Sequence, residues 1–180
     1  GIVIYPRLPS VERLPVEDLK RERVSTGVKG IDGLLGGGLL RGTACVVSGS
    51  TGLGKTLLGL QFLLAGAENG EPGLFVSLEE RPEEIIRFAE SFDFKLGDLV
   101  DAGLLHFLYR VPADLDFNEL GCAIEEVVKK RKIRRLVFDS VSTLSVRIPY
   151  EHQFRNLLYL LVDYMKGNGI TSILTDETYE

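Results

Sequence analysis

The chain has 180 residues, of which 44% are hydrophobic, and a formal net charge of -5 at pH 7. This length and composition are typical of one globular domain with its own core. The negative charge argues against nonspecific coating of DNA, because the chain has no sequence-wide basic field to attract phosphates. No apolar run is long enough to cross a bilayer, and the N-terminus lacks the basic-then-apolar layout of a signal peptide, so we expect a cytoplasmic protein without membrane association.

The first 23 residues are expected to lie outside the main domain. Residues 1–8 contain a short apolar, strand-like run that is closed by Pro6, and residues 9–23 are polar, with mixed charge and no sustained periodicity. The second of these compositions is typical of a linker. We therefore predict a strand-like segment and linker over residues 1–23, and one folded domain over residues 24–180.

Strand and helix patterns alternate through the predicted domain. The expected strands are short apolar runs at residues 44–48, 73–78, 104–108, 136–138 and 171–174. The expected helices lie at residues 56–69, from 82 onward, at 117–130 and at 153–165. Uniformly apolar strands that alternate with helices are typical of a parallel sheet covered on both faces. We predict an α/β fold with a mostly parallel central sheet and helices on both of its faces.

A glycine-rich segment separates the first of these strands from the first helix. It reads Gly49-Ser-Thr-Gly-Leu-Gly54-Lys55-Thr56, the pattern of a phosphate-binding loop (P-loop). The glycines let the main chain turn its N–H groups toward phosphate oxygens, Lys55 adds charge at the β and γ phosphates, and Thr56 offers a hydroxyl ligand to Mg2+. We predict ATP and Mg2+ as cofactors, with nucleotide bound by Gly49, Ser50, Thr51, Gly52, Leu53, Gly54, Lys55, Thr56 and Leu57.

A second candidate is the aspartate that ends the strand Arg135-Leu-Val-Phe-Asp139. A carboxylate at the C-terminal end of a strand in an open α/β sheet points into the crevice where ligands bind. There, Asp139 would hold Mg2+ through water, as the partner of Thr56. The alternative is that Asp139 only begins a turn, which is a common role of aspartate after a strand.

Two glutamates, Glu79 and Glu80, follow the strand at residues 73–78 and so reach the same edge of the sheet. Hydrolysis of ATP needs a general base that polarises water near the γ phosphate, and a carboxylate within reach suits that role. We predict that this pair supplies the catalytic base, and the sequence leaves open which of the two acts. The alternative is that they form a charged lead-in to the helix at Pro82.

The last expected strand is followed by Thr175, Asp176 and Glu177. Two interpretations are open for these residues. They would either sense the γ phosphate or form an exposed polar turn, since loops at strand ends serve both purposes.

The two histidines and the two cysteines are assigned structural roles. His106 and His152 have no third ligand nearby, so they are not predicted to bind metal. Cys45 and Cys122 lack metal-ligand spacing and are predicted to be buried thiols in a reducing compartment.

The sequence has one local basic run, Lys129-Lys-Arg-Lys132 with Arg134 and Arg135. Cations at the end of a helix complement its dipole, so a solvated surface is the first interpretation. Binding of an acidic partner or of DNA is the alternative.

Several motifs together resemble the KaiC branch of the RecA-like ATPases. They are the segment Val24 to Gly42 before the P-loop, the P-loop itself, Phe75 to Glu80, Phe138 to Ser142, and Gly169 to Thr175. The motifs occur in order and cover most of the chain from Val24 onward. Glycines 36–38 of the first motif, taken alone, predict only a flexible turn.

This resemblance implies a RecA-like core with ATP bound between neighbouring subunits, most simply in a hexameric ring. It implies that the activating base is in the pair Glu79 and Glu80, and that Asp139 acts on magnesium. The segment 1–8 is similar to the closing strand and exit linker of a preceding domain, so the chain resembles the second domain of a tandem KaiC-type protein. Because the sequence ends at Glu180, before the family's later strands and its basic residues that reach the adjacent subunit, we expect the domain to be C-terminally incomplete.

Three functions follow as hypotheses. The first is a Mg-dependent ATPase, with Ser/Thr autokinase activity in the full-length protein. The second is a non-catalytic module that uses ATP to hold an assembly or to present a surface to a signalling protein. The third is a RadA-like DNA recombination ATPase, which the acidic balance of the chain disfavours.

Overall fold

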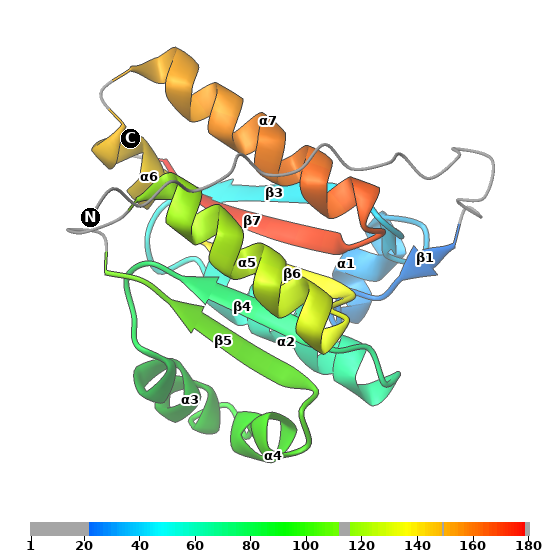
Figure 1. Ribbon diagram of the computed structural model, residues 1–180. Helices are drawn as coiled ribbons and strands as arrows, with labels where there is room; N and C mark the ends of the chain where they lie inside the picture. The colour runs from blue at the N-terminus through cyan, green and yellow to red at the C-terminus, as the bar shows by residue number, and fades with distance from the viewer. Residues whose placement is uncertain (1–21, 112–115, 149, 179–180) are drawn as a thin grey trace.

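The computed structural model describes residues 22–111, 116–148 and 150–178, and the predictions for residues 1–21 lie outside this part. Its centre is a five-stranded sheet, in which each pair of neighbouring strands is parallel. The strands follow the order β3 (Ala44–Gly49), β7 (Thr171–Glu177), β6 (Arg135–Asp139), β4 (Gly73–Ser77) and β5 (Leu105–Tyr109). The predicted α/β fold with a parallel central sheet is confirmed (Figure 1).

Helices pack on both faces of this sheet. One face carries α5 (Phe117–Arg131) and α7 (Glu151–Gly167), which lie in front of the sheet in Figure 1. The other carries α2 (Lys55–Glu68), α3 (Pro82–Glu90) and α4 (Leu96–Asp101). Four short elements complete the described part. They are α6 (Val141–Arg147), the antiparallel strands β1 (Arg23–Val24) and β2 (Leu39–Leu40), and α1 (Lys29–Leu34), which lies between these two strands in the chain.

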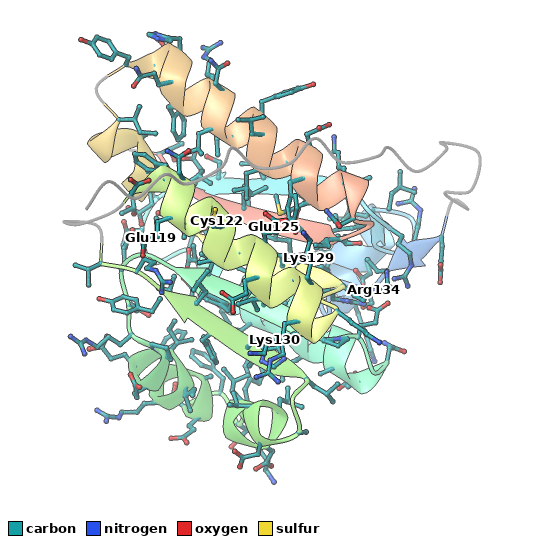
Figure 2. All side chains as sticks on the ribbon, in the orientation of Figure 1. Glu119, Cys122, Glu125, Lys129, Lys130 and Arg134 are labelled. Atoms are coloured by element: carbon teal, nitrogen blue, oxygen red, sulfur yellow. The ribbon has the colours of Figure 1, made fainter. Side chains whose placement is uncertain are left out.

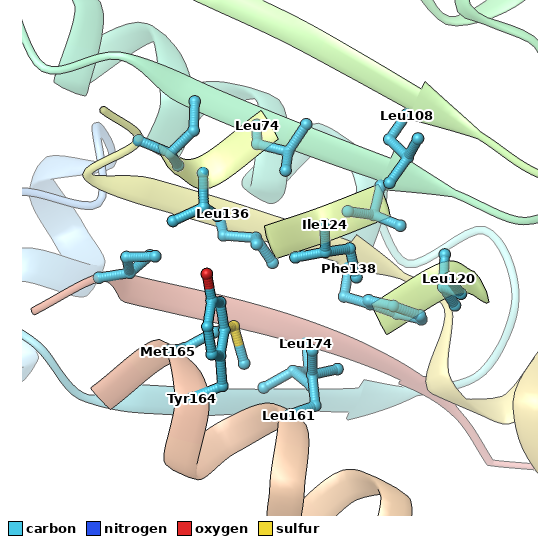
Figure 3. Packing of buried hydrophobic residues seen from close by; sticks show 14 of the residues in the cluster. Leu74, Leu108, Leu120, Ile124, Leu136, Phe138, Leu161, Tyr164, Met165 and Leu174 are labelled. Carbon is cyan, nitrogen blue, oxygen red and sulfur yellow. The ribbon is translucent and has the colours of Figure 1, made fainter. Parts of the chain in front are cut away.

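The core is divided into two layers by the alternation of side chains along the central strands. On β4, Leu74 packs in the cluster under α5 and α7, whereas Phe75 packs in the cluster against α2 and α3. On β6, Phe138 and Val137 divide in the same way. Figure 3 shows the first cluster, which Tyr164 enters from α7. Successive residues in the middle of β4 and β6 are therefore apolar, because both faces of these strands are buried.

The edge strand β3 differs from these central strands. Within the described residues it pairs with β7 alone. Ala44 packs against the cluster under α7, but Val46, two residues further and on the same face, is 62% exposed. The cover by helices is thinner at β3, because this strand lies at the edge of the sheet.

The segment before β3 is folded around the carboxylate of Asp32. Ser25 donates its hydroxyl hydrogen to one carboxylate oxygen (2.5 Å), and Thr26 donates its N–H (2.8 Å) and its hydroxyl (2.7 Å) to the other. Burial alone would raise the pKa of Asp32, but these hydrogen bonds outweigh it and lower that pKa. Gly38 has φ of 110°, and a side chain there would meet the Val24 carbonyl. Glycines 36–38 thus belong to a specific β1–α1–β2 unit and not to a flexible turn.

The basic run extends along the end of α5, where Lys129, Lys130 and Arg134 are labelled in Figure 2. Residues 129–132 and 134 are exposed, and Lys129 pairs with Glu125. Arg135 is different, because it is 2% exposed and begins β6. Its assignment to a basic surface run was wrong.

Arg135 is the centre of a buried ionic cluster at the amino edge of the sheet. Its guanidinium group pairs with Glu71 (2.6 Å), which also pairs with Arg41 (2.6 Å). The Arg135 guanidinium also donates to the carbonyl of Phe62 (2.9 Å) and lies 4.7 Å from the centre of the Phe62 ring. A Cβ atom at Gly66 would lie 2.5 Å from the Arg135 side chain, so this position of α2 needs glycine.

Candidate nucleotide-binding site

The predicted site residues meet around one cavity at the carboxyl edge of the sheet. The cavity has a volume of about 520 Å³. It is lined by residues 51–57 of the P-loop and α2, and by Ser77, Glu79, Glu80, Phe88, Phe92, Asp139, Ser140 and Glu177. These residues come from four strand ends and from α3, as the switch points of an open α/β sheet predict.

The P-loop joins β3 to α2. Gly52 and Gly54 have φ of 83° and 85°, a region that residues with a side chain rarely adopt, and Gly54 is the N-cap of α2. The helix thus begins with its positive dipole end at the cavity. The Lys55 ammonium donates to the carbonyls of Gly49 (2.7 Å) and Ser50 (2.8 Å), and the residue is only 9% exposed.

Thr56 and Asp139, the two predicted magnesium ligands, are in direct contact. The Thr56 hydroxyl donates to one carboxylate oxygen of Asp139 over 2.7 Å, across 83 residues of sequence. The other oxygen accepts from the hydroxyl of Thr175. Burial raises the pKa of Asp139; the two hydroxyl hydrogen bonds oppose this rise and the nearby charge of Glu79 adds to it.

Glu79 and Glu80 both line the cavity, but their surroundings differ. One carboxylate oxygen of Glu79 accepts hydrogen bonds from Ser140 (3.1 Å) and from Thr143, at the start of α6. The turn at Glu80 is held by the Ser77 hydroxyl, which donates to the Glu80 carbonyl (2.7 Å) and accepts from the Glu80 N–H (3.1 Å). Burial, then the charges of Asp139 and neighbouring glutamates, raises the pKa of Glu80.

The residues expected after the last strand are part of it. β7 continues through Glu177, and Thr175, Asp176 and Glu177 pair in register with residues 47–49 of β3. Thr175 is fully buried, while Asp176 accepts from the hydroxyls of Ser48 (3.0 Å) and Ser142 (3.2 Å). The alternative of an exposed polar turn is therefore wrong.

Sequence reasoning missed two groups of residues at the site. The hydroxyls of Ser140 and Thr143 donate to the Glu79 carboxylate, and a run of Ser and Thr after a strand-end aspartate was the available signal. Phe88 of α3 and Phe92, in the turn that follows this helix, line the cavity with their rings 5.2 Å apart, although each is over 40% exposed. Their signal was two aromatic residues four positions apart at the end of a polar helix.

The histidines lie away from this cavity. His106 is on β5, with Nε2 3.1 Å from the Gly103 carbonyl oxygen, and His152 is on α7, its ring 5.7 Å from that of Tyr150. Over the described ranges, no group of three or more His, Cys, Asp or Glu side chains could hold a metal ion. Cys45 and Cys122 are half-buried, so their predicted burial is only partial.

No helix within residues 22–111, 116–148 and 150–178 is both long and apolar enough to cross a membrane.

Fold and site together define a P-loop domain of the RecA-like ATPase class. The family model described as "ATPase: KaiC" matches residues 24–180, and the chain belongs to this family. A solved structure of the KaiC-like protein PH0186 from Pyrococcus horikoshii OT3 superposes with a TM-score of 0.80 at 34% identity, covering 88% of this chain and 72% of that one.

Similarity to curated relatives also indicates the KaiC family. The circadian clock oscillator protein KaiC of Thermostichus vulcanus is 34% identical over 181 residues, covering 94% of this chain and 35% of the relative. The UPF0273 protein MK0039 of Methanopyrus kandleri is 34% identical over 171 residues, covering 87% of this chain and 67% of the relative. The chain thus spans about a third of the length of the KaiC clock protein that it matches.

Proposed function

We propose that the chain binds ATP with Mg2+ in the cavity at the carboxyl edge of the sheet and hydrolyses it. The observation that carries this proposal is the hydrogen bond between Thr56 and Asp139. It joins the P-loop to a strand-end carboxylate in one cavity with Glu79 and Glu80. Phosphate binding, metal binding and water activation therefore have candidate groups within one volume.

The phosphates would be held by the P-loop main chain, by the N-terminus of α2 and by Lys55. Lys55 is bonded to two main-chain carbonyls and is well placed to exchange them for phosphate oxygens. Thr56 and Asp139 supply the hydroxyl and carboxylate oxygens that Mg2+ prefers, and their contact fits such a site. When bound, the metal would neutralise the charge that develops on the phosphates.

Water activation is assigned to the pair Glu79 and Glu80. The hydroxyls of Thr143 in α6 and of Ser140, the N-cap of this helix, orient one carboxylate oxygen of Glu79. The second carboxylate oxygen is the one that we assign to the water. Glu80 has a raised pKa, which brings it closer to the range suited to a general base at neutral pH. The two single Gln variants separate these contributions.

Phe88 and Phe92 would form an apolar surface for the nucleobase. Both rings line the same cavity as the P-loop, and both are partly exposed. Aromatic side chains offer large apolar faces on which a planar ring can stack. Replacing Phe88 or Phe92 by Ala is expected to weaken binding of ATP more than binding of inorganic triphosphate, which has no base.

The proposal includes a ring, hexameric by family resemblance, with ATP at subunit interfaces. Among the described residues that line the cavity, Lys55 is the one Lys or Arg, whereas Glu79, Glu80, Asp139 and Glu177 are acidic. A bound triphosphate adds further negative charge, so Mg2+ and cations from outside this set would be needed. A neighbouring subunit is the simplest source.

The proposal also includes a Ser/Thr autokinase activity of the whole protein, a signalling partner and a cytoplasmic location. These three parts are supported by the family resemblance alone. The competing non-catalytic function predicts assembly on ATP without turnover. A DNA-dependent motor predicts turnover that DNA stimulates.

The test measures Mg-dependent release of phosphate from ATP and sedimentation with and without ATP. Lys55→Ala is expected to lose nucleotide binding, whereas Glu79→Gln and Glu80→Gln should keep binding and lower turnover by about 100-fold in at least one case. Glu83→Gln, on the exposed first turn of α3, is the matched control. If the single and double glutamate variants all turn over ATP at the wild-type rate, the assigned base is wrong.

A further inference from the structure

Glu177 is held at the mouth of the P-loop by its main chain. It is the last residue of β7 and pairs in register with Gly49. Its N–H donates to the hydroxyl of Ser142 over 2.6 Å, and the N–H of Thr178 donates to the carbonyl of Gly49 over 3.3 Å. The position of Glu177 is thus set by the sheet and by α6, and not by an unattached loop.

The side chain of Glu177 contacts the P-loop. One of its carboxylate oxygens accepts a hydrogen bond from the hydroxyl of Thr51 (3.1 Å), and the same oxygen lies 3.9 Å from the ammonium nitrogen of Lys55. The side chains of Lys55 and Glu177 are 8% and 22% exposed. In such partly buried surroundings water and salt screen charges less than at an exposed surface.

The carboxylate therefore lies against two groups that the phosphates of a nucleotide would use. From this contact we infer that Glu177 sets the nucleotide affinity of the site: its carboxylate competes with phosphate oxygens for Lys55 and Thr51, and so weakens binding and speeds release of ADP. The inference rests on the proposed function, because it needs phosphates at the P-loop. It assigns to Glu177 a role different from water activation, which Glu79 and Glu80 hold.

The physical reason is repulsion between like charges that share one cation. Phosphate and carboxylate oxygens both need the Lys55 ammonium, and within the cavity lining no other Lys or Arg is described. A ligand must displace the carboxylate or bind beside it, and either event costs free energy. The cost should increase with the negative charge of the ligand near Lys55.

The test compares the wild type, Glu177→Gln and the control Glu68→Gln by titration calorimetry with Mg-ADP, Mg-ATP and adenosine. Gln keeps the size of the side chain and can still accept from Thr51. Glu68 is exposed at the far end of α2, so its variant makes the same change in net charge away from the site. We expect Glu177→Gln to bind ADP and ATP about tenfold more tightly, and to release ADP more slowly, with adenosine affinity unchanged.

Three outcomes would overturn the inference. One is an equal gain in Glu68→Gln, which would indicate net charge alone. Another is an unchanged or weaker affinity in Glu177→Gln while the wild type binds and Lys55→Ala does not. The third is unchanged affinity with lost turnover, which would make Glu177 a catalytic residue. If no folded variant and no wild-type protein binds nucleotide, the proposed function fails together with this inference.

Discussion

The two ends of the central sheet carry ionic clusters of opposite character. At the amino edge, Glu71 lies between Arg135 and Arg41. Burial alone would raise the pKa of Glu71, but the two arginines outweigh it and lower that pKa. At the carboxyl edge, burial raises the pKa of Asp139 and of Glu80, and nearby carboxylates add to both shifts.

This difference separates a structural cluster from a functional one. The charges of the amino edge have partners within the chain, so they stabilise the fold as they stand. The carboxylates of the carboxyl edge outnumber the cation beside them, so a bound cation would relieve their repulsion. A site that is electrostatically unfavourable in the protein alone is suited to bind a metal ion with nucleotide.

The largest expected effect comes from breaking the balanced cluster. Arg135→Ala should lower the free energy of unfolding by about 3–5 kcal/mol, because it removes one of the two arginines that pair with the partly buried Glu71 and also removes contacts to Phe62. Chemical denaturation measures this loss. Arg134→Ala, the exposed neighbour, is the control and should change stability by less than about 0.5 kcal/mol. Equal effects of both variants would contradict a special role for Arg135.

The second largest effect is expected when Mg-ATP binds to the cluster of carboxylates at the carboxyl edge of the sheet. A ligand that binds only the folded protein stabilises it by about 2.7 kcal/mol at a concentration 100 times its dissociation constant. Mg-ATP should therefore raise the melting temperature in the wild type and much less in Lys55→Ala. Thermal scans with ATP plus EDTA separate the metal from the nucleotide. A shift that EDTA leaves unchanged would contradict the magnesium site.

A smaller effect is expected at Asp139, and in the opposite direction from Arg135. Asp139→Asn removes a charge whose pKa is raised by burial, so it should raise the free energy of unfolding while lowering Mg-dependent turnover. Denaturation and phosphate release, measured on the same preparation, test both parts. A variant that loses stability as well as turnover would show that hydroxyl hydrogen bonds, and not repulsion, dominate at this position.

The smallest effect is the dependence of stability on pH. Glu71 has a folded pKa below its ordinary 4.5, so its stabilisation is present above pH 4.5 and is lost as pH falls below it. Glu80 has a raised folded pKa, so it destabilises the fold at neutral pH, and this cost is relieved as pH falls toward 4.5. Glu71→Gln should reduce the fall in the free energy of unfolding below pH 4.5. Glu80→Gln should remove the gain in the free energy of unfolding that the wild type shows as pH falls toward 4.5. Urea denaturation from pH 3 to pH 7 checks both signs, and a common response of the two variants would contradict the comparison.

Much of the fold was readable from the sequence. The central strands β4 and β6 carry buried apolar runs, residues 74–76 and 136–138, and α5 and α7 are long enough to show helical periodicity. The helices α1, α4 and α6 were missed, because six or seven residues are too few for a period to appear. The last residues of β7 were missed because their polar side chains follow the requirements of the site and not of the core.

The candidate site divides in the same way. The P-loop was predicted because its chemistry lies in consecutive residues, and Asp139, Glu79 and Glu80 because they end strands. The contact of Glu79 with Thr143 joins residues 64 positions apart, and that of Thr51 with Glu177 joins residues 126 positions apart. No local pattern contains such pairs.

The sequence by itself determined that this chain has a P-loop between a strand and a helix, and that carboxylates follow two further strands. Only the tertiary structure decided which charges have partners. Arg135 and Lys132 are alike in a sequence reading, yet the first is buried against Glu71 and the second is exposed. The reason is that pairing and pKa depend on distances of a few ångströms in space, which the order of strands in the sheet sets.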